Sequence, residues 1–163
     1  DLYIGAFVMF GDVELTVHCA AELLKLAPEY DYLIAPEAKA IPLLYEMARQ
    51  SGADKYFLAR KGAKAYMTGV FEVAVRSITT MSMQKLVIDT ADAELMREKR
   101  ILIVDDVIST GESLHAMEEL VTKAGGIIAG KMAVLAEGDA MKRNDIITLG
   151  YLPTFNPDGS VKA

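Results

Sequence analysis

Apolar residues along this chain fall into short continuous runs, separated by longer segments in which they recur every three or four positions. The runs at residues 31–35, 55–59, 100–106 and 127–137 predict β-strands. Strands that are covered on both faces carry such near-continuous apolar sequence. Because helical segments separate these runs, the order is strand–helix–strand, which is the repeating unit of a parallel sheet.

The helical segments have recognisable ends. The first predicted helix runs from Asp12, a suitable N-cap, to Ala27, which precedes a proline. The second covers residues 38–51 and the third covers residues 112–125, each closed by a glycine. A shorter polar connector at residues 91–99 is predicted to be helical as well.

A different pattern occurs in the middle of the chain and at its two ends. Residues 70–78 and 85–89 alternate in a way that predicts an antiparallel pair with a mobile connection. Residues 2–10 predict a short strand or extended segment, and residues 145–155 predict a last strand. The whole pattern predicts a doubly wound, mainly parallel α/β sheet with a small extra element from the N-terminus.

The totals are typical of one globular domain spanning residues 1–163. Hydrophobic residues make up 52% of the chain and charged residues 25%. The net charge of −6 disfavours a general nucleic-acid-binding surface, and no apolar run approaches the length of a membrane span. The single cysteine, Cys19, excludes an intrachain disulfide framework and a cysteine zinc cluster. We therefore expect a cytoplasmic protein without a membrane or nucleic-acid partner.

The stretch Ile101–Ser113, ILIVDDVISTGES, carries the candidate chemistry. Its apolar strand ends on Asp105 and Asp106, and parallel sheets bind ligands beyond the carboxyl ends of their strands. Residues 109–113 are of the types that let backbone amides and hydroxyls converge on a phosphate at a helix N-terminus. The two carboxylates repel a phosphate but accept hydrogen bonds from ribose hydroxyls. The stretch therefore predicts a site for a ribose 5-phosphate.

Three other interpretations fit this stretch less well. A Walker A loop needs G-x-x-x-x-G-K-[ST], which the chain lacks. A response-regulator receiver has paired acids near its start, whereas this pair lies at 105–106 of 163 residues. A purely structural strand end is disfavoured because two adjacent acids are costly to desolvate.

The same stretch closely resembles the 5-phosphoribosyl 1-pyrophosphate (PRPP) binding motif of type I phosphoribosyltransferases. Three further segments are similar to adenine phosphoribosyltransferases: FGDVEL at 10–15, APEAKAIPL at 35–43 and ARKGAKAY at 59–66. The resemblance covers about residues 7–155. It implies the family's doubly wound, mainly parallel sheet, with a small hood from the N-terminal and C-terminal segments.

The resemblance also implies a role for each matching residue. Asp105 and Asp106 would bind the ribose hydroxyls, and the loop after them would hold the 5-phosphate. The implied PRPP-binding set is Asp105, Asp106, Val107, Ile108, Ser109, Thr110, Gly111, Glu112 and Ser113. The implied pyrophosphate-binding set is Pro36, Glu37, Ala38, Lys39, Arg60, Lys61 and Lys64. Catalysis would rest on Asp105, Asp106, Lys61 and Lys64.

Further expectations follow from the resemblance. Residues 63–84, approximately, would form a flexible antiparallel lid, and the chain would form a homodimer. The cofactor would be Mg²⁺, held mainly by PRPP, so that no dedicated metal site on the protein is expected. The reaction would transfer phosphoribose from PRPP to a nucleobase and release pyrophosphate.

The base half of the adenine pattern is altered. Lys39 stands where those enzymes have arginine, and Ala40-Ile41 replaces Gly-Phe. Residues 76–84 lack the family's lid glutamate. Adenine is the expected base, with xanthine, hypoxanthine and orotate as alternatives. A non-catalytic PRPP-binding regulator is the alternative of a different class.

Overall fold

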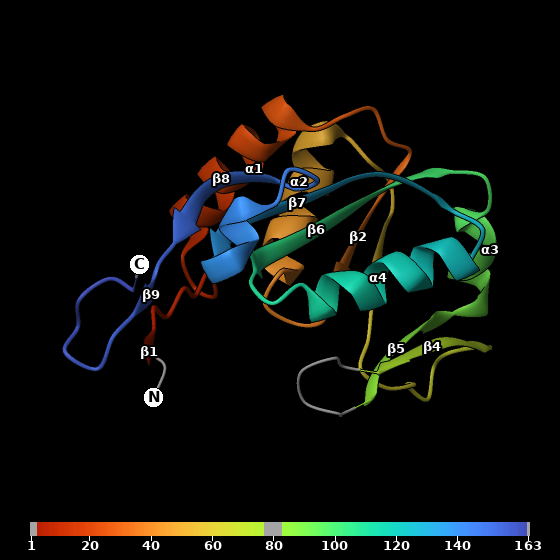
Figure 1. Cartoon of the computed structure of the whole chain (residues 1–163). Coiled ribbons are helices and arrows are strands. Elements are labelled where there is room, and N and C mark those ends of the chain that lie inside the picture. Colours follow the sequence, from red (N-terminus) through yellow and green to blue (C-terminus); the bar gives the residue numbers. More distant parts are fainter. Residues whose placement is uncertain (1–2, 77–82, 163) are drawn as a thin grey trace.

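The computed structural model describes residues 3–76 and 83–162, and a five-stranded parallel sheet lies at its centre (Figure 1). The strand order is β3-β2-β6-β7-β8, and every neighbouring pair is parallel. The strands are β2 (Tyr32–Pro36), β3 (Tyr56–Ala59), β6 (Arg100–Ile108), β7 (Ile127–Glu137) and β8 (Ile147–Leu152). The predicted parallel sheet is confirmed.

Helices cover both faces of this sheet (Figure 1). One face carries α1 (Val13–Leu26) and α2 (Ile41–Ser51), and the other carries α3 (Thr90–Met96) and α4 (Glu112–Lys123). Because side chains alternate along a strand, β6 supplies Leu102 to the core under α1 and α2 and Ile103 to the core under α4. The fold is therefore doubly wound, as predicted.

The predicted antiparallel pair is present as a separate hairpin of β4 (Val70–Arg76) and β5 (Met83–Asp89). Val73 pairs with Leu86, and both are buried in the core under α4. Residues 77–82, which belong to the expected lid, lie outside the described residues. The flexibility of this lid stays a prediction.

The two ends of the chain form the expected hood. The short strands β1 (Tyr3–Ile4) and β9 (Thr154–Phe155) pair in antiparallel fashion beside the main sheet (Figure 1). The last strand was predicted to be continuous over 145–155, which is wrong. It is split at Pro153, because proline has no N–H to donate to a ladder.

The first residues of two helices can be compared with the predicted helix starts. Asp12 caps α1 as predicted, and its Oδ1 accepts the amide of Leu15 at 2.9 Å. The second helix was predicted to begin at residue 38, but residues 37–40 form a turn and α2 begins at Ile41. Within the described part of the chain, none of the helices combines the length and the apolar character that a bilayer crossing requires.

Candidate functional site

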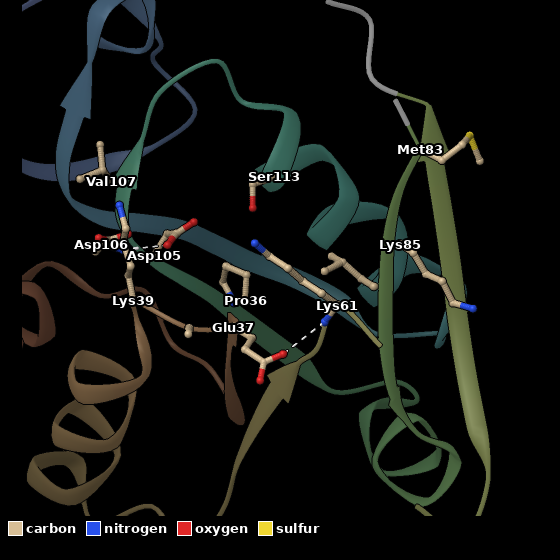
Figure 2. A pocket seen from close by; sticks show the side chains of 12 residues that line it. Pro36, Glu37, Lys39, Lys61, Met83, Lys85, Asp105, Asp106, Val107 and Ser113 are labelled. Carbon is tan, nitrogen blue, oxygen red and sulfur yellow. Dashed lines mark hydrogen bonds between the residues drawn. The ribbon is translucent and has the colours of Figure 1, made fainter. Parts of the chain in front are cut away.

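A cavity of about 570 Å³ opens at the carboxyl ends of β2 and β6 (Figure 2). Parallel α/β sheets bind ligands at this edge. The cavity wall combines the end of β2, the residues after β3, part of β5, the end of β6 and the first turn of α4. The described lining residues are Pro36, Glu37, Ala38, Lys39, Lys61, Met83, Lys85, Leu86, Asp105, Asp106, Val107 and Ser113.

The two acids lie at the end of β6, as the sequence predicted. The amide of Asp106 donates to Oδ1 of Asp105 at 2.9 Å, while the Asp106 side chain is only 5% exposed. Among the residues that the structure describes, none donates a hydrogen bond to Oδ2 of Asp106, which is fully buried. Burial and the neighbouring Asp106 carboxylate raise the pKa of Asp105 to about 8. Buried acceptors normally have donors, so this pair is suited to hydroxyl groups of a ligand.

The loop after the acids leads into α4 through Gly111, whose φ of +81° is left-handed and favours glycine. Gly111 supplies no side-chain cap to α4, but Oγ1 of Thr110 accepts the amide of Glu112 at 3.4 Å. The dipole of α4 favours a negative charge at this end of the helix. Ser113 lies on the cavity wall.

Basic side chains also reach the cavity, and Lys39 lies beside the two acids (Figure 2). Lys39 and Lys61 line the cavity, and in Figure 2 the amine of Lys61 faces Asp105 and Ser113. Glu37 is held by Arg60, whose Nη1 lies 2.8 Å from Oε1 of Glu37, and by the amide of Lys61 at 3.4 Å. Arg60 thus positions Glu37 and does not itself line the cavity.

The structure brings together only part of the predicted set. Among the described lining residues, several predicted ones do not occur: Arg60, Lys64, Ile108, Ser109, Thr110, Gly111 and Glu112. Ile108 is buried in the core under α4, so only its backbone is available to a ligand. The roles of these residues stay predictions.

Sequence reasoning placed Met83 in the expected lid but missed the two other residues that β5 contributes to the cavity wall. Met83, Lys85 and Leu86 line the cavity because the hairpin packs across α4. Lys85 also pairs with Glu72 on β4 at 2.6 Å. No local motif marks these residues, and the only available signal was the predicted pairing of the two strands.

Magnesium is a good fit to this donor set. Mg²⁺ usually keeps several waters and binds through one or two carboxylates and substrate phosphates. The described residues contain no group of three or more His, Cys, Asp or Glu side chains placed to hold a metal. The unpartnered Oδ2 of Asp106 nevertheless puts a hard oxygen acceptor at the cavity, where a hydrated ion carried by a phosphorylated ligand would meet it.

An acidic pair, the N-terminus of α4 and two lysines meet at the carboxyl edge of the sheet, which places the chain in the class of doubly wound α/β proteins that bind a ligand at this edge. Comparison with known proteins agrees with this class. The chain belongs to the phosphoribosyl transferase domain family, which matches residues 18–148. The family predicted from the sequence is therefore confirmed.

Individual relatives differ in their bases. The hypoxanthine/guanine phosphoribosyltransferase of Methanocella paludicola is 32% identical over 76% of this chain and 59% of its own length. The adenine phosphoribosyltransferase of Kosmotoga olearia is 28% identical over 72% and 66%, respectively. The chain thus spans less than two thirds of these curated relatives. The crystal structure of the Thermoanaerobacter pseudethanolicus adenine phosphoribosyltransferase has a TM-score of 0.71 and 23% identity, covering 86% of this chain and 82% of that one, which shows the shared fold.

Proposed function

We propose that this chain transfers the 5-phosphoribosyl group of PRPP to a ring nitrogen of a purine base and releases pyrophosphate. The observation that carries the proposal is the division of one cavity wall into two parts. Asp105, Asp106 and Ser113 form the part of the wall that comes from β6 and α4, and Lys39 and Lys61 form the part that comes from the residues after β2 and β3. PRPP has hydroxyls and a 5-phosphate for the first part and a pyrophosphate for the second.

Each part of the wall has a distinct task in the reaction. Asp105 and Asp106 accept hydrogen bonds from the ribose hydroxyls and fix the sugar, and residues 109–113 hold the 5-phosphate. As the bond from C1 to the pyrophosphate oxygen breaks and the bond to the base nitrogen forms, negative charge grows on the pyrophosphate. Lys39 and Lys61 stabilise that charge. Mg²⁺, when bound with PRPP, supplies further positive charge to the leaving group.

The hairpin of β4 and β5 protects the reacting sugar from water. Its contribution to the cavity wall includes Met83 and Leu86, which are apolar. A sugar cation that meets water is hydrolysed, so an apolar cover over C1 favours transfer to the base. Closure of the hairpin over the cavity is part of this proposal.

Adenine is the first candidate base. The fold likeness to adenine phosphoribosyltransferases supports it, although orotate phosphoribosyltransferases also match the sequence. One observation favours the non-catalytic PRPP-binding regulator: the described residues of β5 that line the cavity, Met83, Lys85 and Leu86, include no carboxylate.

The deciding experiment is nucleotide synthesis from PRPP and Mg²⁺ with adenine, hypoxanthine, guanine, xanthine or orotate in turn. We expect a nucleoside monophosphate and an equal amount of pyrophosphate, with adenine fastest. PRPP binding by calorimetry without turnover of any base would favour the regulator. A protein that does not bind PRPP at all would contradict both.

The resemblance also leads us to propose a homodimer in the cytoplasm. Phe10, Val13 and Tyr45 are apolar or aromatic and at least half exposed, and Val13 and Tyr45 border a shallow groove between α1 and α2. Sedimentation analysis of the purified chain tests this assembly. A monomer at micromolar concentration would contradict it.

A further inference from the structure

An arginine from the connection between β7 and β8 lies against the loop that leads into α4. Arg143 follows the 3-10 helix η1 (Gly138–Lys142), and its amide donates to the carbonyl of Ala140 at 3.1 Å. A methyl group built on Gly111 would lie only 2.8 Å from Nη1 of Arg143. The guanidinium therefore lies directly beside the N-cap residue of α4.

The guanidinium is held in one orientation. Its Nε and Nη2 donate to the two oxygens of Asp145 at 2.9 and 2.7 Å, so this edge is occupied. The nitrogen next to Gly111 is the remaining one, Nη1. A bidentate pair fixes the plane of an arginine as well as its position. Nη1 consequently faces the loop that leads into α4.

A half-buried lysine connects this pair to the helix. Lys131 on β7 is 15% exposed and donates to Asp145 at 2.5 Å and to Glu118 of α4 at 2.7 Å. Burial acts to lower the pKa of Lys131, but its bonds to Asp145 and Glu118 outweigh that effect and raise the pKa. The lysine thus stays charged and ties β7, the β7–β8 connection and α4 together.

Asp145 and Glu118 balance Arg143 and Lys131, and the N-terminus of α4 adds further positive potential beside Arg143. The N-terminus of a helix carries a partial positive charge, so a cation there is unfavourable. The groups that act on Arg143 are Asp145, which bonds to it and raises its pKa, and more distantly Glu118. Asp145 already shares its charge with Lys131. A phosphate between Nη1 and the first amides of α4 would satisfy both positive groups.

We propose that Arg143 is a further PRPP-binding residue, which contacts the 5-phosphate, and that Asp145 and Lys131 position it. The inference rests on the proposed function. The strand order places β6 between β2 and β7. Arg143 therefore approaches the loop after β6 from the side of β7, whereas Lys39 and Lys61 approach from the side of β2 and β3. Its partner is the 5-phosphate and not the pyrophosphate.

The test separates the two phosphate ends of PRPP. Calorimetry would measure the affinity of the whole chain for ribose 5-phosphate and, separately, for pyrophosphate with Mg²⁺. Loss of one charge-assisted hydrogen bond predicts that Arg143→Gln weakens ribose 5-phosphate binding about tenfold or more, with pyrophosphate binding unchanged. Arg143→Lys should recover part of the loss. Lys131→Met should weaken ribose 5-phosphate binding less than Arg143→Gln does.

Arg97 provides a matched control, because it lies beside Gly125 just beyond the other end of α4, with its Cγ 3.4 Å from a methyl built there. Arg97→Gln should leave both affinities unchanged. Equal ribose 5-phosphate binding by Arg143→Gln and the unaltered chain would overturn the inference and leave the proposed function standing. Loss of pyrophosphate binding instead would also overturn it. If the unaltered chain binds neither ribose 5-phosphate nor PRPP, the proposed function itself fails.

Discussion

At the scale of single residues, Asp105 and Asp106 serve ligand binding and do not stabilise the fold. Replacing both aspartates by asparagine should greatly weaken PRPP binding without unfolding the protein. Each carboxylate offers charge-assisted hydrogen bonds of about 1.5–3 kcal/mol, so replacing both predicts a loss of affinity of about 100-fold or more. The free energy of unfolding should not fall, because Oδ2 of Asp106 has no partner to lose among the described residues.

The double variant Asp105→Asn, Asp106→Asn tests this. Calorimetry with PRPP and Mg²⁺ measures the affinity, and urea unfolding measures the stability. Arg97→Gln serves as the control, because Arg97 lies beside Gly125, just beyond the other end of α4. Unchanged PRPP affinity in the double variant would refute the assignment of the acids to the ribose.

Asp105 also predicts an unusual dependence of stability on pH. Burial and the neighbouring Asp106 raise its pKa in the folded protein to about 8, from an ordinary value of 3.8. Between these values the folded state binds more protons than the unfolded state, so the free energy of unfolding falls as the pH rises. The contribution is fully present below about pH 4 and is lost as the pH passes through about 8.

The measurement is the difference in unfolding free energy between the unaltered chain and Asp105→Asn in urea at several pH values from about 5 to 8. We expect the free energy of unfolding of the unaltered chain to fall relative to that of Asp105→Asn as the pH rises. Asp31 and Glu46, whose pKa values are lowered to about 2 by bonds from Arg100 and Arg49, respectively, lose their contributions only at lower pH. Parallel curves for the two proteins would contradict the prediction.

At the scale of elements, α1 depends on its cap. Asp12 accepts the amide of Leu15 at 2.9 Å, and α1 buries Ala20 and Leu23 against the sheet. Asp12→Ala should lower the unfolding free energy by about 1 kcal/mol, because an orphan amide loses its acceptor. Glu22→Ala, which removes an exposed pair with Lys25, should cost less than about 0.5 kcal/mol. Urea unfolding compares them, and equal losses would argue against the cap.

The same scale separates what sequence could predict from what it could not. The strand and helix around residues 101–113 were predictable, because apolar runs, helical spacing and a glycine turn are all local signals. The contact between Gly111 and Arg143 was not, because it depends on how η1 returns to α4. Likewise, Met83 reaches the cavity only through the packing of the hairpin on α4. The part of the site that comes from one continuous segment was therefore predictable from the sequence. The part that distant segments bring together was not.

At the scale of the whole molecule, the site connects loops from both sides of β6, so ligand binding should stabilise the entire fold. A ligand at about 100 times its dissociation constant that binds only the folded state raises the unfolding free energy by about 2.7 kcal/mol. We expect PRPP with Mg²⁺ to give a rise of this size and PRPP alone to give less.

Adding Mg²⁺ without PRPP tests whether the protein binds the metal ion on its own. The described residues lack a group of three or more metal-binding side chains, and Mg²⁺ prefers to keep its waters unless phosphates help to hold it. Millimolar Mg²⁺ alone should therefore leave the urea midpoint unchanged, while adding it together with PRPP should raise the midpoint beyond the effect of PRPP. Ca²⁺ alone, at the same ionic strength, controls for general screening. A midpoint that rises with Mg²⁺ alone would mean that the protein carries its own metal site, because no substrate phosphate would then be needed to hold the ion.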